Sequence, residues 1–145
     1  MSEIEISAMT LKDLEEIKSI LQKDFDEFWN YEILKEEIVN TNSSYFVAKN
    51  SNIIVGFAGI KKILDEANIM NIVTKKTCRN NGIATSLLKE LINFSKRTCT
   101  TITLEVNENN KIAIHLYEKF GFKKVGMRKK YYGGIDNAII MTLYF

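Results

Sequence analysis

The stretch from residue 66 to residue 108 places a strand, a helix and a second strand in direct succession, and this constrains the fold more than any other feature. "EANIMNIVTKK" is strand-like, and "TTITLEVNE" alternates polar with apolar residues. Between them, the helix that follows Gly82 carries one apolar face, made of Ile83, Leu87, Leu88, Leu91 and Ile92. Such a succession predicts a βαβ crossover, which is normally right-handed and joins parallel strands.

The remaining segments add strands and helices on both sides of this crossover. Strands are expected at residues 3–8, in "SYFVAKN" and "IIVGFAGIKKIL", and at residues 122–132 and 138–145, with turns at Asn50-Ser51 and Asp65-Glu66. Helices are expected after a capping box of Thr10 and Asp13, with Leu14, Ile17, Leu21 and Phe25 on one face, and at residues 31–39 and 110–120. The resulting order, β-α-α-β-β-β-α-β-α-β-β, predicts a mixed α/β (α+β) fold.

The composition fits a single domain without a strong charge signature. The chain has 145 residues, 46% of them hydrophobic, and a formal net charge of +2. This length predicts one domain spanning residues 1–145. The basic residues do not form the stripe that nucleic-acid binding shows, so no direct nucleic-acid partner is expected. The one dense basic run, residues 128–130, is interpreted as a solvated strand end or loop.

The cysteines and the first residues of the chain bear on other protein classes. Cys78 and Cys99 have no CxxC or His-rich spacing around them, so we expect reduced thiols and no metal site. No apolar run approaches the roughly 20 residues of a membrane span, and residues 1–13 lack the pattern of a signal peptide. The expected localisation is cytoplasmic, with no membrane partner.

The turn before the central helix reads "RNNGIA", from Arg79 to Ala84, and no acidic residue occupies the first turn of that helix. Helix N-termini carry partial positive charge and unpaired backbone N–H groups, so an end without a carboxylate is suited to an external anion. The turn lacks the lysine and hydroxyl pair of a Walker A loop and two of the three glycines of a dinucleotide fingerprint. By itself it fits either an anion-binding loop or an ordinary exposed turn.

Four segments together resemble the GNAT acetyltransferases. "RNNGIA" fits the acetyl-CoA loop of that family, which reads Gln or Arg, two variable residues, Gly, one variable residue, then Gly or Ala. "LDEANIMNIVT", "LEVNENNKIAIHLYEKFGF" and "RKKYYGGIDNAIIMTL" are similar to the fourth strand, the fifth strand with its following helix, and the closing hairpin. The likeness extends over essentially the whole chain and is strongest to the RimI-type ribosomal-protein-alanine N-acetyltransferases.

This resemblance implies acetyl-CoA as the cosubstrate and a set of residues that contact it. The pyrophosphate is expected at the backbone N–H groups of Asn80, Asn81, Gly82, Ile83, Ala84 and Thr85. The thioester carbonyl is expected at backbone N–H groups of Ile72, Val73 and Thr74, whose side chains alone would be interpreted as core. Asn110 matches a further coenzyme contact, although an asparagine at a helix start is equally typical of an N-cap.

The resemblance also implies direct acetyl transfer by an acid and base pair. Glu105 matches the proton acceptor of the family, and its position opposite the apolar face of its strand also fits a simply solvated carboxylate. Tyr117 matches the proton donor, and its place in the apolar stripe of its helix also fits core packing. A lone helical His115 without a partner in sequence is interpreted as structural.

The expected acceptor is the N-terminal alanine of a small-subunit ribosomal protein, whose N-terminal segment would be the partner. Trp29, Tyr131 and Tyr132 are candidate walls of the peptide groove, with aromatic core packing as the alternative. The connector near Trp29 lacks a proline that the family usually has, which leaves the exact acceptor open. The alternatives are an acetyltransferase for lysine or a small-molecule amine, and a non-catalytic acyl-CoA-binding module. A monomer or weak dimer is expected.

Overall fold

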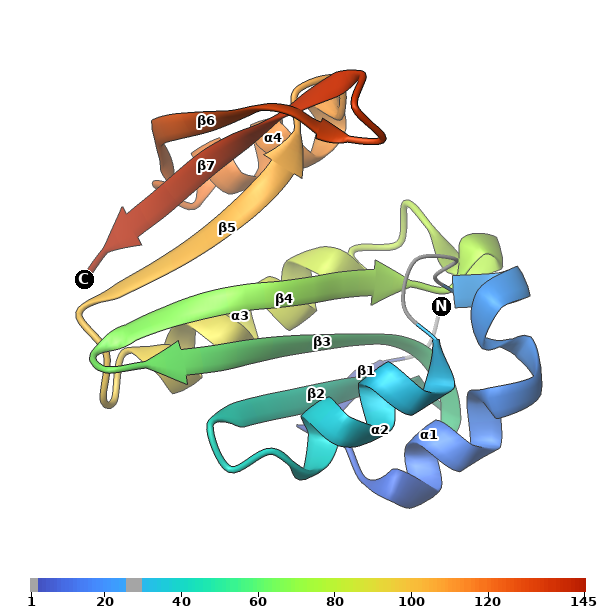
Figure 1. Ribbon diagram of the computed structural model, residues 1–145. Helices are drawn as coiled ribbons and strands as arrows, with labels where there is room; N and C mark the ends of the chain where they lie inside the picture. The colour runs from blue at the N-terminus through green and yellow to red at the C-terminus, as the bar shows by residue number, and fades with distance from the viewer. Residues whose placement is uncertain (1–2, 26–29) are drawn as a thin grey trace. The chain divides into compact units, whose positions relative to one another are not determined.

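The computed structural model describes residues 3–25 and 30–145, and its elements follow the expected order (Figure 1). The strands are β1 (Ile4–Ala8), β2 (Ser43–Asn50), β3 (Ile53–Ile63), β4 (Glu66–Thr74), β5 (Thr101–Asn107), β6 (Lys123–Tyr132) and β7 (Asp136–Tyr144). The α-helices are α1 (Leu11–Ile17), α2 (Tyr31–Val39), α3 (Ile83–Ser95) and α4 (Lys111–Lys119). The strands of this part of the chain are hydrogen-bonded in the order β1-β2-β3-β4-β5-β7-β6, a mixed sheet, so the expected fold class is confirmed.

The chain divides into two compact units that share strand β4. The first unit contains the chain up to Lys61 together with Met70–Phe94, and the second contains Lys62–Ile69 and Ser95–Phe145. The first therefore holds β1, β2, α1 and α2, with β3 as far as Lys61, α3 as far as Phe94 and the second half of β4. The second holds the first half of β4, β5 to β7 and α4.

In the first unit, α1 and α2 lie on one face of the strands (Figure 1). The buried side chains of this face belong to Met9, Leu14, Ile17, Leu21, Phe25, Leu34, Tyr45, Val47, Ile54, Phe57 and Val73. The helix after Thr10 changes its winding, from α-helix to a 3-10 turn at Lys18–Ile20 and a π-helical turn at Leu21–Phe25. The 3-10 turn is wound more tightly than an α-helix and the π-helical turn more widely, so the two changes offset each other. The four apolar residues expected on one face are therefore all buried, namely Leu14, Ile17, Leu21 and Phe25.

The start of α1 is fixed by the capping box that the sequence predicts. The Thr10 backbone N–H donates to Asp13 Oδ2 at 2.9 Å, and the Asp13 N–H donates to Thr10 Oγ1 at 3.1 Å. The other carboxylate oxygen of Asp13, Oδ1, forms an ion pair with Lys49 Nζ at 3.0 Å. Because Lys49 lies on β2, this carboxylate joins the first turn of α1 to the sheet.

Two glycines of β3 allow close packing on the two faces of the first unit. On the α1 and α2 face, Gly59 pairs with Tyr45 of β2, and a Cβ on Gly59 would overlap the Tyr45 ring, so the ring packs directly on the glycine. On the other face, a Cβ on Gly56 would lie 2.8 Å from the Val73 carbonyl oxygen and 2.9 Å from Ile83 Cγ2. The beginning of α3 therefore packs directly against β3 and β4.

In the second unit, β5 pairs with β4 on one side and with β7 on the other. The parallel ladder from β4 to β5 covers the pairs of Glu66, Ala67 and Asn68 and ends at Asn68 opposite Thr103, which confirms the expected βαβ crossover with parallel strands. The antiparallel ladder from β5 to β7 continues as far as Asn107. Helix α4 covers one face of β5 and β7, and β6 is the outer strand (Figure 1).

The turns that join β2 to β3 and β3 to β4 lie one residue away from the expected pairs. Ser51 and Asn52, with φ of 50° and 69°, form the turn between β2 and β3, and Leu64 with φ of 57° precedes Asp65 in the next. Two successive positive φ values match the twist of a two-residue hairpin. The turns expected at Asn50-Ser51 and Asp65-Glu66 are therefore shifted, because Asn50 and Glu66 already belong to the strands.

Candidate active site

The loop before α3 is held in shape by its own residues. Asn80 and Gly82 both have positive φ, 68° and 76°. The Asn81 side chain donates from Nδ2 to the carbonyl oxygens of Cys78 at 3.1 Å and Arg79 at 3.3 Å. These two bonds use loop carbonyls and leave the backbone N–H groups at the start of α3 unaffected. The Asn81 side chain thus stabilises the loop through two carbonyl oxygens.

The N-terminus of α3 is as open as the sequence predicts. The first turn contains no acidic residue, and the first intrahelical bond runs from the Ser86 N–H to the Gly82 carbonyl at 3.0 Å. The N–H groups of Ile83, Ala84 and Thr85 precede that bond and therefore have no partner within the helix. With the helix dipole, they make a site that favours an anion.

Gly82 is constrained by its backbone and not by crowding within the chain. A Cβ built on Gly82 would have no described protein atom within 4 Å. Its φ of 76° nevertheless lies in the left-handed region, where any L side chain is strained. A larger residue here would either shift the loop or reach into the space in front of the N–H groups.

The β4 segment from Ile72 to Thr74 lies in the first unit, next to this loop in the sequence. Val73 is buried on the α1 and α2 side of the strands, whereas Ile72 and Thr74 are half-buried. The strand end is anchored by the Lys75 N–H, which donates to the Val55 carbonyl of β3 at 2.8 Å. The half-buried pair lies beyond Asn68, where the ladder to β5 ends.

Glu105 lies on the polar face of β5, as the alternation of that strand predicts. Ile102, Leu104 and Val106 are buried, and the Glu105 side chain is 28% exposed. Its Oε1 is 2.7 Å from Nε of Arg128, a β6 residue whose side chain is 59% exposed. The carboxylate is therefore reachable and has a cationic partner in the second unit.

Tyr117 lies on α4, which covers the other face of β5. Ile114 and Glu118 of α4 line a groove of about 440 Å³ together with Ile139 and Met141, which pair with the apolar residues of β5. Tyr117 is half-buried, and its ring centroid is 5.8 Å from that of Phe122. Glu105 thus lies on one face of β5, and α4 covers the other. A substrate that contacts both Glu105 and Tyr117 must therefore approach along the edge of β5.

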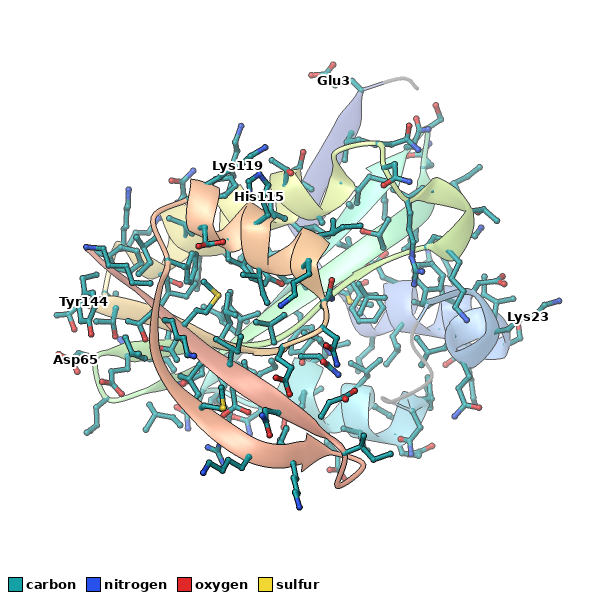
Figure 2. The ribbon with its side chains drawn as sticks, turned by 90° about the horizontal axis from the view of Figure 1, so that it is seen from above. Glu3, Lys23, Asp65, His115, Lys119 and Tyr144 are labelled. Atoms are coloured by element: carbon teal, nitrogen blue, oxygen red, sulfur yellow. The ribbon has the colours of Figure 1, made fainter. Side chains whose placement is uncertain are left out.

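Two other polar residues of α4 have structural surroundings. Asn110 is the N-cap, and its Oδ1 accepts the Ala113 N–H at 3.2 Å. The capping alternative for Asn110 is therefore present, while its contact with coenzyme stays a prediction. His115 is exposed and, like Lys119, projects from the outer side of α4 (Figure 2).

The candidate walls of the acceptor groove are only partly described. Tyr131 is 54% exposed, and its ring centroid is 5.6 Å from Arg128 Cζ. Its core-packing alternative is therefore wrong, because the side chain is largely in solvent. Trp29 and the side chain of Tyr132 lie outside the described residues.

Comparison with known proteins decides the family. The model described as the acetyltransferase (GNAT) family matches residues 14–122. The chain belongs to the GNAT acetyltransferase family. It is therefore an acetyl-CoA-dependent N-acetyltransferase, and acetyl-CoA is its cosubstrate, as the sequence analysis predicts.

Relatives and solved structures resemble this GNAT acetyltransferase along nearly its full length. A ribosomal protein bS18-alanine N-acetyltransferase of Haemophilus influenzae is 36% identical over 146 residues, covering 96% of this chain and 97% of the relative. The crystal structure of the ribosomal-protein-S18-alanine N-acetyltransferase from Escherichia coli has a TM-score of 0.88 at 31% identity and covers 98% of this chain and 94% of that one. Arabidopsis thaliana NAA60 in complex with acetyl-CoA, at 20% identity and a TM-score of 0.85, shares the fold over 99% of each chain.

Three further features concern metal-binding groups, cysteines and membrane-spanning helices. Within residues 3–25 and 30–145, no group of three or more His, Cys, Asp or Glu side chains is placed to hold a metal ion. Cys78 and Cys99 are free thiols, as expected. None of the described helices has the length and apolar character needed to cross a membrane.

The expected site residues of the acetyltransferase fall into two groups. The loop at residues 80–85 and the segment at residues 72–74 belong to the first unit, and Glu105, Tyr117 and Asn110 belong to the second. The sequence does not indicate Arg128 as a partner of Glu105, since Arg128 begins the basic run at residues 128–130 that is interpreted as a solvated strand end or loop. The arginine on the closing hairpin is visible in the sequence, but its contact with Glu105 depends on strand pairing that the sequence alone does not specify.

Proposed function

We propose that this enzyme acetylates the N-terminal α-amine of a protein, namely the N-terminal alanine of a bS18-type ribosomal protein. The observation that carries the proposal is the 36% identity to the Haemophilus influenzae enzyme of that name, which spans 96% of this chain and 97% of the relative. Such full coverage leaves no large part of either protein without a counterpart. The E. coli enzyme named for the same acceptor, at 31% identity and a TM-score of 0.88, supports the proposal independently.

In the proposed reaction the acetyl group moves directly from coenzyme A to the amine. The neutral amine nitrogen attacks the thioester carbonyl, a C–N bond forms, and the C–S bond breaks. Glu105 accepts the proton that the nitrogen loses, and Tyr117 gives a proton to the departing thiolate. A phenol with a pKa near 10 can protonate a thiolate whose conjugate acid has a pKa near 8.5 in a modestly uphill transfer.

Backbone N–H groups of the first unit are proposed to supply most of the coenzyme contacts. The three N–H groups at the start of α3 are open to a pyrophosphate, and N–H groups of Ile72, Val73 and Thr74 are proposed to polarise the thioester carbonyl. Asn110 is proposed to contact the coenzyme with the part of its amide that does not cap α4. The exposed Tyr131, with Trp29 and Tyr132, is proposed to line the acceptor groove.

An α-amine is a chemically favourable acceptor for such a site. Its pKa near 8 leaves about one-tenth of it as free base at pH 7, whereas a lysine with a pKa near 10.4 is on the order of one part in a few thousand free base. An α-amine therefore reaches the reactive, neutral state at neutral pH far more often than a lysine side chain does.

The test is acetylation of synthetic peptides followed by mass spectrometry. A peptide that copies the start of a bS18-type protein, with a free N-terminal alanine, should be acetylated on that amine and faster than an internal lysine. The same peptide with a blocked terminus should not react. Equal acetylation of lysine in the blocked peptide, or faster acetylation of spermidine than of every peptide, would replace this proposal with the lysine or small-amine alternative.

A further inference from the structure

We infer that Arg128 is a specificity-determining residue, whose positive charge beside Glu105 disfavours cationic acceptors and so selects weakly basic α-amines over lysines and polyamines. This inference rests on the proposed function, in which Glu105 receives the amine proton. It starts from the contact of 2.7 Å between Arg128 Nε and Glu105 Oε1.

The pairing of three strands explains how Arg128 reaches that carboxylate. Ile140 of β7 pairs with Glu105 of β5, and Ala138 of β7 pairs with Arg128 of β6. Directly paired residues point to the same face of a sheet, and so do residues two apart on one strand, so Arg128 and Glu105 share a face with β7 between them. Two strand spacings amount to about 10 Å. The Arg128 side chain must therefore extend across β7 to make the contact.

Two of the residues beside this path, Ala138 and Gly126, carry little or no side chain. Ala138, the ladder partner of Arg128, ends at its Cβ and is fully buried. Gly126, which pairs with Ile140, adds no side chain on the same face. The guanidinium also has an aromatic neighbour, because Arg128 Cζ is 5.6 Å from the Tyr131 ring centroid. Arg128 thus contacts a carboxylate and lies near an exposed aromatic ring.

This arrangement affects charged and neutral amines differently. An ammonium group that approaches Glu105 Oε1 meets a guanidinium already bound there, and two like charges at such short range repel each other. A neutral amine meets no such repulsion. Acceptors that exist partly as free base at neutral pH are therefore admitted, and acceptors that are almost wholly protonated are disfavoured. The much larger free-base fraction of an α-amine turns this difference into selectivity.

A surface ion pair of this kind would otherwise be interpreted as a minor contribution to stability. Exposed pairs contribute little to the free energy of unfolding, and Arg128 is 59% exposed. A purely structural role would move the melting temperature slightly and leave the choice of acceptor unchanged. Selectivity between amines is therefore the readout that separates the two interpretations.

The experiment compares the full-length wild type with Arg128→Gln, Arg128→Lys and Lys129→Gln. Lys129→Gln is the matched control, because it removes one positive charge from the same strand and retains Arg128. The acceptors are a lysine-free peptide with a free N-terminal alanine, its N-terminally blocked analogue with one lysine, and spermidine. The measured quantities are kcat and KM for each acceptor, with melting temperatures to verify folding.

Arg128→Gln should lower the KM for the lysine peptide and for spermidine, and reduce the kcat/KM preference for the α-amine by about tenfold or more. Arg128→Lys should recover most of the preference, because it keeps the charge, and Lys129→Gln should match the wild type. A selective wild type with an equally selective, folded Arg128→Gln would overturn this inference alone. A wild type that acetylates lysine as readily as the α-amine would overturn the proposed function, and the inference with it.

Discussion

Glu105 and Tyr117 are the two residues to which the proposed chemistry assigns proton transfer, and their surroundings differ. Glu105 is a partly exposed carboxylate bound by Arg128, and Tyr117 is half-buried beside Phe122 on α4. Because they belong to opposite faces of β5, removing either side-chain function leaves the other in place. Single substitutions therefore test the two roles separately.

Glu105→Gln should lower kcat at neutral pH by on the order of 10²-fold, because a positioned general base typically contributes this much. Part of the rate should return as pH rises and the acceptor loses its proton to solvent. Tyr117→Phe should also slow turnover while keeping the ring that packs on Phe122. Steady-state kinetics across pH with a fixed peptide measures both effects. Full activity in both variants would show that positioning alone carries the catalysis.

At the scale of elements, the capping box of α1 combines a local motif with a long-range contact. Asp13 closes the box with Thr10 and also binds Lys49 of β2. Burial raises the pKa of Asp13, but the backbone N–H of Thr10, the ammonium of Lys49 and the hydroxyl of Thr10 together lower it below its ordinary value of 3.8. The ionised carboxylate is thus favoured in the folded state.

Asp13→Asn should destabilise the chain by about 1 kcal/mol at pH 7, because the amide oxygen can still accept the Thr10 N–H but the charge facing Lys49 is lost. A folded-state pKa below the unfolded value means that this stabilisation is present above pH 3.8 and is lost as pH falls through the lower, folded value. Urea unfolding of both proteins from pH 7 to pH 3 should therefore show their difference shrinking at the acidic end. A difference that stays constant with pH would assign the effect to packing.

Several features of these elements could be predicted from the sequence because they depend on neighbouring residues. The helix at Tyr31–Val39, the Thr10 and Asp13 box and the alternation of β5 all arise from local spacing, and each is confirmed. Features that join different strands could not be predicted in this way. The packing of the Tyr45 ring on Gly59 depends on which residues the strand ladders place opposite one another, and so does the ion pair between Arg128 and Glu105.

At the scale of the whole molecule, the open N-terminus of α3 should couple coenzyme binding to stability. Acetyl-CoA that binds only the folded chain stabilises it by about 2.7 kcal/mol at a concentration of 100 times Kd. For a chain of 145 residues, this corresponds to a rise in Tm on the order of 5 to 10 °C. Thermal unfolding of the full chain with increasing acetyl-CoA measures it.

Gly82→Val should remove most of that rise and increase the KM for acetyl-CoA by at least about tenfold. Valine at a φ of 76° is strained, and relief of the strain moves the N–H groups that are proposed to hold the pyrophosphate. Gly134→Val is the matched control, because Gly134 has a φ of 72° and equally open surroundings but lies between β6 and β7. The control should lose comparable stability without coenzyme and keep the acetyl-CoA response. An undiminished response in a folded Gly82→Val variant would mean that the coenzyme binds elsewhere.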